Sequence, residues 1–410
     1  MKIGLLAYHS ACNFGASLQL LSTYMYLKNH QHNPIVINWI PLSLEENYKR
    51  QVPVSQFDMQ KDIRRMLWQE TALCRTTEDV ARIIDSESLD AVIIGSDAVA
   101  QHHPLLERIV FPCRTGIGIK KNTADMEFPN PFWATWQKLL KRPVPVAVMS
   151  VSCQDSSYRF IPFWVRKAMS IHIDNYAYLS VRDDWTRDMM IWLTKGKCQP
   201  PITPDPVFAF NQNAGSLVPS HDEIQKKFNL PEKYILLSFL PRRTPSVTQT
   251  WIEEFQQIAK ADGYTCITLP FAHGDSFGRL DNNVSLPLTP IDWYGLIKYA
   301  NGYVGNNMHP IVISLHNQVP FFSFDTYGTT YMNGLIASDK SSKIKHILNQ
   351  ANLSAWRISA LTRYTHPPKA EDVYRKLITF NKSNASQFAT SCLKRYNDMM
   401  DNVMNALHNE

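Results

Sequence analysis

The chain has 410 residues, of which 44% are hydrophobic and 19% are charged. This composition excludes wholesale disorder, and the length predicts two or three domains. The net charge of +6 is modest for the size, and no run of Lys and Arg is interleaved with aromatic residues, so we expect no nucleic-acid partner. The charge suits anionic small substrates, or loose contact with an anionic membrane surface.

Neither a membrane span nor a disulfide framework is expected. No apolar run approaches the roughly 18 residues that a spanning helix needs, and residues 1–8 are typical of a strand and too short for a signal peptide. We therefore expect a cytoplasmic protein, with peripheral contact at the inner face of the membrane left open. The seven cysteines are scattered and never form a CxxC pair, which predicts free, buried thiols and no structural zinc site.

Short apolar segments alternate with amphipathic segments along the chain. This alternation is typical of parallel sheets that helices cover on both faces, so the predicted fold class is α/β. The expected strands are residues 2–7, 34–39, 89–95, 144–150, 176–181, 234–239, 264–269, 301–304 and 320–324. The expected helices include residues 14–27, 161–169, 185–193, 248–261 and 291–299.

A polar, proline-containing stretch at residues 204–219 separates two series of these elements. We therefore predict two α/β domains, residues 1–212 and 213–383, that meet at the carboxyl ends of their strands. Residues 384–410 are expected to form a helix that packs back on the domains; a helix lying on a membrane surface is the alternative. The irregular segment at residues 102–131 is long for a loop, which predicts a functional or mobile element.

Several familiar signatures of ligand binding are missing from the sequence. No GxGxxG, GxxxxGK[ST], HExxH or GxSxG occurs, so neither a dinucleotide fingerprint nor a P-loop, a zinc-protease helix or a hydrolase elbow is expected. An enzyme with this sequence is expected to bind anions through helix N-termini and through Arg or His side chains.

Residues 300–315 are the most informative segment. A predicted strand ends at Val304, a turn follows, and Pro310 suits the first turn of a helix. We therefore expect His309 and free backbone N–H groups at a helix N-terminus, at the carboxyl end of a strand. Such a position favours a phosphate or a carboxylate. The alternative is that His309 is only a capping or interior histidine.

Polar residues follow other predicted strands as well. Because the carboxyl ends of parallel strands meet at one edge of a sheet, these side chains are expected to lie near one another. Each also has a simpler interpretation as a turn residue, a helix cap or a solvated surface residue. The residues are His9, Asn13, Asp97 and Arg182 in the first half, and Arg242 and Arg243 after the first strand of the second half.

Five segments, residues 8–20, 92–99, 180–186, 203–208 and 305–327, together resemble the polysaccharide pyruvyltransferase family. The resemblance extends in order over roughly residues 1–330. It implies a two-domain enzyme of GT-B type, with two Rossmann-like domains that face each other across a cleft. It also implies transfer of a pyruvyl group from phosphoenolpyruvate to a sugar diol of a cell-surface polysaccharide or its lipid-linked precursor, giving a pyruvate ketal and phosphate.

The resemblance also implies roles for particular residues. His309 would be the catalytic acid and later the base, because the pKa of a histidine lies near the working pH. Arg182, Asn307 and Met308 would bind the donor. The family commonly has Arg where this chain has Asn307, and a cation from Arg242 or Arg243 would then replace it. The resemblance implies no metal and no cofactor beyond phosphoenolpyruvate as co-substrate.

The acceptor glycan is expected on the first half, in contact with His9, Asn13 and Asp97. Trp39 and the aromatic residues in 132–136 could stack on sugar faces, but core positions are the simpler interpretation, and the helical spacing within 132–136 favours it. Two other functions stay open. One is a nucleotide-sugar-dependent glycosyltransferase of GT-B type, and the other is a catalytically degenerate, glycan-binding subunit of a polysaccharide assembly complex.

Overall fold

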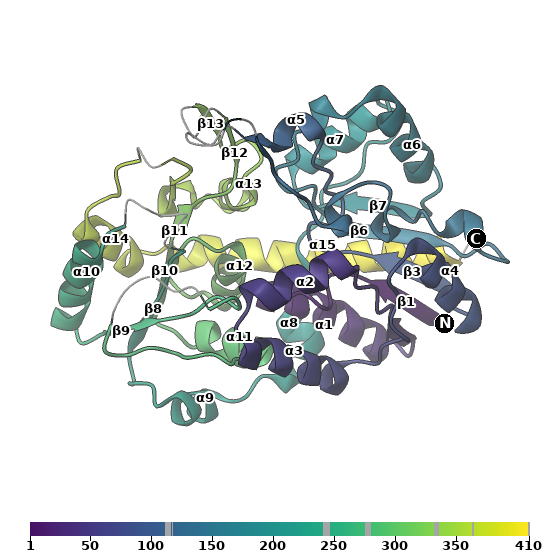
Figure 1. Ribbon diagram of the computed structural model, residues 1–410. Coiled ribbons are helices and arrows are strands. Elements are labelled where there is room, and N and C mark those ends of the chain that lie inside the picture. Colours follow the sequence, from purple (N-terminus) through teal and green to yellow (C-terminus); the bar gives the residue numbers. More distant parts are fainter. Residues whose placement is uncertain are drawn as a thin grey trace.

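Two five-stranded parallel sheets form the centres of two α/β domains (Figure 1). The computed structural model describes residues 1–110, 116, 118–240, 247–274, 280–331, 336–362 and 365–408. The strand orders are β2-β1-β3-β6-β7 in the first sheet and β14-β11-β10-β8-β9 in the second. When the strands are numbered along the chain within each sheet, both sheets have the order 2-1-3-4-5. Such a sheet binds ligands beyond the carboxyl ends of its first and third strands, where the chain order reverses.

The first sheet consists of β1 (Lys2–Leu6), β2 (Asn33–Val36), β3 (Ala91–Ile94), β6 (Val146–Val151) and β7 (Tyr178–Val181). Its helices are α1 (Phe14–Asn29), α2 (Leu42–Gln51), α3 (Val54–Leu67), α4 (Thr77–Ser86), α6 (Phe163–Ile173) and α7 (Asp184–Leu193). Side-chain caps fix several helix starts: Asn13 accepts hydrogen bonds from the N–H groups of Gly15 and Ala16, and Asp183 accepts one from Thr186. A cap satisfies N–H groups that have no partner within the helix.

The predicted irregular segment at 102–131 contains only short elements among its described residues. These are α5 (Leu105–Arg108), the antiparallel pair β4 (Ile109–Val110) and β5 (Gly118–Ile119), and the 3₁₀ helix η1 (Ala124–Met126); η2 (Pro131–Trp133) begins at its end. Further 3₁₀ helices, η3 (Gln137–Leu139) and η4 (Tyr158–Phe160), flank β6.

The second sheet consists of β8 (Tyr234–Ser238), β9 (Thr265–Thr268), β10 (Gly302–Gly305), β11 (Phe321–Asp325) and β14 (Arg357–Ser359). Its helices are α9 (His221–Phe228), α10 (Gln249–Ala261), α11 (Pro290–Lys298), α12 (Met308–Asn317), α13 (Lys343–Gln350) and α14 (Ala370–Ile378). A two-stranded ribbon of β12 (Thr329–Tyr331) and β13 (Ile336–Ser338) follows β11, and the 3₁₀ helix η8 (Ser354–Trp356) precedes β14.

Strand residues alternate between two cores, as the pleat of a strand requires. Ile3 and Leu5 of β1 pack into a cluster that also holds Leu236 of β8, whereas Leu6 packs on the far side of the first sheet. Ile235 packs on the far side of the second sheet. The shared cluster includes residues of α1, α11 and α12, so one continuous core joins the two domains. The connecting elements η5 (Pro206–Ala209) and α8 (Phe210–Ala214) pack against α1 in this core, and η6 (Gly215–Leu217) follows them.

The last helix, α15 (Lys382–His408), runs along both domains and ends near the N-terminus (Figure 1). It contacts α12 of the second domain and β6 and β7 of the first. Tyr396 is fully buried; its hydroxyl accepts a hydrogen bond of 3.1 Å from Asn213, and its ring meets Tyr26 edge-on. The α15 helix therefore packs against both domains. None of the described helices combines the length and the apolar character that a bilayer span requires.

Several predictions about the core are confirmed. Trp39, Phe132, Trp133 and Trp136 are buried. The described cysteines have free thiols, and all of them are buried except the partly exposed Cys198. The α/β class and the arrangement in two parallel-sheet domains are also confirmed.

Candidate active site

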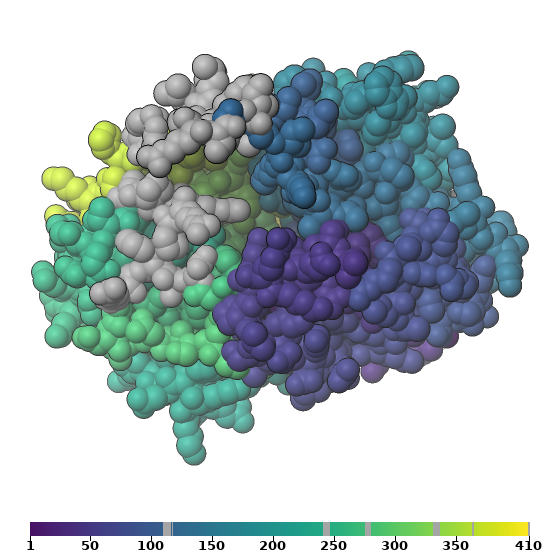
Figure 2. All heavy atoms as spheres, viewed as in Figure 1, coloured from purple at the N-terminus to yellow at the C-terminus, as the bar shows by residue number. Residues whose placement is uncertain are grey.

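A cavity of about 740 Å³ lies between the two domains, at the carboxyl ends of the strands. Figure 2 shows the face where the purple start of the chain, the blue segment after it and the green second domain meet. The cavity wall includes residues that follow β1 and β3 in the first sheet and β8 and β10 in the second, so both topological switch points open into one space. Wall residues include Tyr8, Cys12, Asn13, Asp97, Gln101, Asp125, Gln154, Arg182, Phe271, His273, Trp293, Asn306, Asn307, Met308, His309 and Lys343.

The N-terminus of α12 forms one part of this wall. Asn307 is the N-cap residue, but its side chain makes no capping hydrogen bond. The N–H groups of Met308 and His309 in the first turn therefore have no capping side chain among the described residues, and Pro310 has no N–H group. Neighbouring Asn306 is buried, and neither polar atom of its amide has a partner among the described residues. Unpaired donors at the positive end of a helix dipole favour an anionic ligand.

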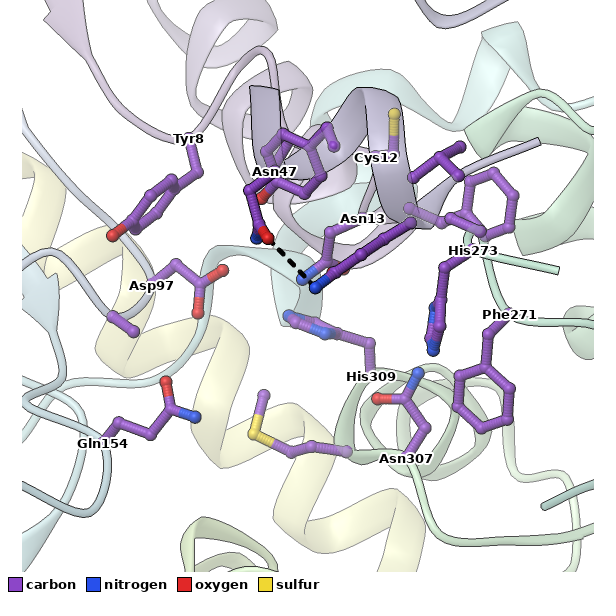
Figure 3. Close-up of a pocket in the computed structure, with 18 of the residues that line it drawn as sticks. Tyr8, Cys12, Asn13, Asn47, Asp97, Gln154, Phe271, His273, Asn307 and His309 are labelled. Carbon is purple, nitrogen blue, oxygen red and sulfur yellow. Dashed lines mark hydrogen bonds between the residues drawn. The ribbon is translucent and has the colours of Figure 1, made fainter. Parts of the chain in front are cut away.

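His309 lies at the centre of the site, with Tyr8, Asp97 and Gln154 on one side and Phe271 and His273 on the other (Figure 3). Its ring packs directly against the first turn of α1, because a Cβ atom added to Gly15 would lie only 2.0 Å from Nδ1 of His309. Burial lowers the pKa of His309 below its ordinary value, while the Asp205 and Asp97 carboxylates act in the opposite direction. The Nε2 atom lies 3.9 Å from Asp205 Oδ2 and has no hydrogen-bond partner among the described residues.

Asp205 is the buried acceptor that organises this part of the wall. Its Oδ2 atom accepts hydrogen bonds of 2.6 Å from both Arg182 and Gln19, and its Oδ1 atom accepts one of 3.0 Å from the Val207 N–H. Arg182 also meets Asp97 at 3.3 Å. Burial alone would raise the pKa of Asp97, but Arg182 and Lys343 hold it below its ordinary value. The charge of Arg182 is thus already matched by two carboxylates.

Lys343 supplies a second cation, which the sequence did not lead us to expect. It is the first residue of α13, whose start is capped by the Ser342 side chain. Its side chain is buried yet lines the cavity, and it forms no hydrogen bond or ion pair with the described residues. Burial and the nearby Arg182 charge lower the pKa of Lys343 below its ordinary value. This lysine therefore offers a charge that a ligand can neutralise.

A hydrogen-bonded group of Asp125, Tyr8 and Gln101 lines the cavity on the side of the first domain. The Tyr8 hydroxyl donates to Asp125 Oδ2 at 2.8 Å and accepts from the Gln101 amide at 2.8 Å. Asp125 is 3% exposed, and its Oδ1 atom accepts no hydrogen bond from the described residues. Burial raises the pKa of Asp125 above its ordinary value. An unpaired, buried carboxyl oxygen beside a cavity is a strong acceptor for a hydroxyl-rich ligand.

The structure brings most of the predicted site residues together. Asn13, Asp97, Arg182, Asn307, Met308 and His309 all line the cavity. His9 does not. Its ring is buried, with Nδ1 near the Ala7 carbonyl oxygen at 3.1 Å and Nε2 near Asn38 Oδ1 at 2.9 Å. Arg242 and Arg243 lie outside the described residues.

Comparisons with known proteins identify the family of this chain and agree with its fold. The family model for polysaccharide pyruvyl transferase matches residues 13–327, which is more than half of the chain. The chain therefore belongs to the polysaccharide pyruvyl transferase family, as its motifs predicted. No curated relative matches the sequence significantly.

Two solved structures illustrate the similarity of fold. UDP-GlcNAc 2-epimerase from Neisseria meningitidis superposes with a TM-score of 0.55 at 7% identity, over 99% of this chain and 100% of that one. The same enzyme from Methanocaldococcus jannaschii gives a TM-score of 0.50 at 9% identity, over 95% and 99% of the two chains. These neighbours have the GT-B architecture, so the predicted GT-B-like arrangement is confirmed.

The contact between Gly15 and His309 leads to a stability prediction. Gly15→Ala places a methyl group in the space of the imidazole, and we expect it to destabilise the protein by about 1–3 kcal/mol, as overpacking does. Gly215→Ala is the matched control, because its nearest neighbour is an ordinary contact at 3.9 Å. Urea unfolding midpoints measure both changes.

A double variant tests the cause of this loss. Gly15→Ala with His309→Ala should recover most of the stability lost by Gly15→Ala alone, because the clashing ring is gone. Equal destabilisation by Gly15→Ala with and without His309 would mean that the two residues do not meet as described.

Proposed function

We propose that this protein transfers a pyruvyl group from phosphoenolpyruvate to a sugar diol, forming a pyruvate ketal and releasing phosphate. The observation that carries the proposal is the positive end of the cavity, where Lys343 forms no ion pair with the described residues. There, Lys343 and the N-terminus of α12 lie beside His309, in a chain that belongs to the polysaccharide pyruvyl transferase family. Phosphoenolpyruvate carries a phosphate and a carboxylate, and both need donors and cations.

The reaction requires a group that acts first as a general acid and then as a general base. A proton added to the methylene carbon of the donor makes a methyl group and an electrophilic centre at C2, which one sugar hydroxyl attacks. The C2–O bond to phosphate then breaks, phosphate leaves with a proton, and the second hydroxyl closes the ring. The two sugar hydroxyl groups lose two protons in total. These balance the proton added to the methylene carbon and the proton that leaves with phosphate.

His309 is our candidate for these proton transfers. Burial lowers the pKa of His309, so the imidazole is neutral at pH 7. A bound dianion favours the protonated form, and Asp205 at 3.9 Å would stabilise the imidazolium. Binding of phosphoenolpyruvate would therefore favour protonation of His309, which is the form that can donate a proton to the donor.

Lys343 also accounts for the departure at Asn307. Where the family commonly has an arginine, this chain has an asparagine whose side chain lines the cavity. The ammonium of Lys343 is a cation that could replace it, and this supports an active enzyme over a degenerate glycan-binding subunit. In this proposal the main role of Arg182 is to hold Asp205 and Asp97 in place and to add positive charge near the donor.

The acceptor would lie on the side of the first domain, against Asp125, Tyr8, Asn13 and Asp97. Carboxylates and amides are suitable partners for sugar hydroxyls. We propose a cell-surface polysaccharide or its lipid-linked precursor as the acceptor, and a cytoplasmic location where phosphoenolpyruvate is present. The scheme needs no metal and no cofactor other than this co-substrate.

Mass analysis of the products tests the proposal. The protein is incubated with phosphoenolpyruvate and a panel of nitrophenyl and lipid-linked glycosides, and phosphate release is followed in parallel. We expect a pyruvyl ketal on at least one glycoside, loss of the product with His309→Ala, and full activity with the exposed-histidine control His221→Ala. Glycosyl transfer from a UDP-sugar, with no use of phosphoenolpyruvate, would favour a glycosyltransferase instead.

Lys343 should matter for donor binding in particular. Lys343→Met keeps the length of the side chain but removes the charge, and we expect the KM for phosphoenolpyruvate to rise about tenfold or more. Lys345→Met is the matched control, because that lysine lies on the same helix but pairs with Asp339 at the surface. An unchanged KM with Lys343→Met would show that another cation binds the donor.

Asp125 should matter for the acceptor. Asp125→Asn removes the negative charge but keeps the shape, and we expect kcat/KM for the glycoside to fall about tenfold or more while the KM for phosphoenolpyruvate stays unchanged. Asp62→Asn, on the exposed side of α3, is the control. A rise in the KM for phosphoenolpyruvate alone would show that Asp125 contributes to binding of the donor and not of the acceptor.

A further inference from the structure

A group of large apolar side chains is exposed on the outer side of the first domain. Trp164 is 73% exposed, Phe163 65% and Leu106 63%, and Leu105 and Phe160 are about half exposed. We call these five residues the aromatic face. They come from α5, η4 and the first turn of α6, and Figure 1 shows α5 and α6 on the same side of this domain. A hydrogen bond of 2.9 Å from the Ser157 N–H to Glu107 ties α5 to the segment that leads into η4.

The exposed stripe of α6 continues this face. Phe163, Lys167 and Ile171 follow one another at intervals of four residues, and all three are exposed. A surface helix of a water-soluble domain normally turns its polar residues outward. Here the outward stripe is apolar and basic, whereas Met169 and Ile173 face the core.

Basic residues outnumber acidic ones around the face, where Glu107 of α5 and Asp155 and Asp174 beside the η4–α6 segment are the nearby acidic residues in sequence. Residues 156–173 contain Arg159, Arg166 and Lys167 but no Asp or Glu. Lys195 and Lys197, both exposed, lie just beyond the end of α7, and the Lys195 ammonium lies 6.0 Å from the centre of the Phe163 ring. A basic rim around exposed aromatic side chains complements a surface that is negatively charged outside and apolar beneath.

We propose that the aromatic face binds peripherally to an anionic lipid membrane. Phe163 and Trp164 would enter the interfacial region, where aromatic rings are favoured, and the lysines and arginines would contact the head groups. A second copy of the chain is a poorer occupant, because a two-fold contact would bring two basic rims together.

The face also adjoins the cavity along the chain. Gln101 lines the cavity four residues before Leu105, and Gln154 lines it six residues before Phe160. The aromatic face is therefore close in sequence to cavity residues of the first domain. Membrane binding itself does not depend on the proposed pyruvyl transfer and is measured without it.

Co-sedimentation of the full chain with vesicles tests the proposal. We expect binding to vesicles of phosphatidylcholine with about 30% phosphatidylglycerol, and much weaker binding to phosphatidylcholine alone or in about 1 M salt. The affinity of F163S/W164S for the anionic vesicles should be lower by about tenfold or more, because burial of one large apolar side chain strengthens binding by about tenfold or more.

Two further variants separate the causes. M66S/I378S removes equally exposed apolar side chains from α3 and α14 and should bind like the unmodified protein. K167E/K195E should lose binding to anionic vesicles while circular dichroism and the melting temperature stay unchanged.

Two outcomes would overturn the proposal. Equal vesicle binding by the unmodified protein and F163S/W164S would exclude the aromatic face. A dimer in solution that F163S/W164S converts to a monomer, with no vesicle binding by either form, would make the face a contact between copies of the chain.

Discussion

The buried carboxylate of Asp205 is the constraint on which the rest of the site depends. It lies in the connection between the domains and accepts hydrogen bonds from Gln19 of α1 and Arg182 after β7. His309, from the second domain, lies 3.9 Å from the same oxygen. One buried carboxylate thus lies in contact with α1 of the first domain, with the residue that follows β7 and near the central histidine. Because a buried charge is tolerated only when it is well paired, this carboxylate allows little freedom in how the domains meet.

The same arrangement explains which cation is left for a ligand. Arg182 is the more obvious candidate from sequence, but Asp205 and Asp97 already neutralise it. Lys343 is buried against the cavity with no such partner among the described residues, and the first turn of α12 adds unpaired N–H groups. The positive end of the cavity is therefore made by a lysine and a helix N-terminus, with the arginine as a structural support. The Asp125 group opposite them is negative and suits hydroxyl groups.

Much of this architecture could be predicted from the sequence, because continuous apolar strands and amphipathic helices have distinct periods. The position of His309 at a helix start followed from Val304 and Pro310 in the same way. The roles of Asp205 and Lys343 could not be predicted from local sequence patterns. The role of Asp205 depends on partners that are far apart in sequence. No local pattern predicts that Lys343 is buried. Asp125 lies in an irregular segment that has no period to interpret. His9 and Asn13 are four residues apart, but Asn13 lines the cavity and His9 is buried away from it. The direction of the turn after β1 decides this difference, and the sequence does not show that direction.

The pKa of His309, followed by NMR of the histidine ring with and without phosphoenolpyruvate, tests the central claim most directly. A His309→Gln variant assigns the signal. We predict a pKa below 6.5 in the free protein, because burial disfavours the imidazolium, and a higher pKa when the dianionic donor is bound beside it. A His309 signal whose titration is unchanged at saturating phosphoenolpyruvate would contradict the account, because the donor would then lie elsewhere.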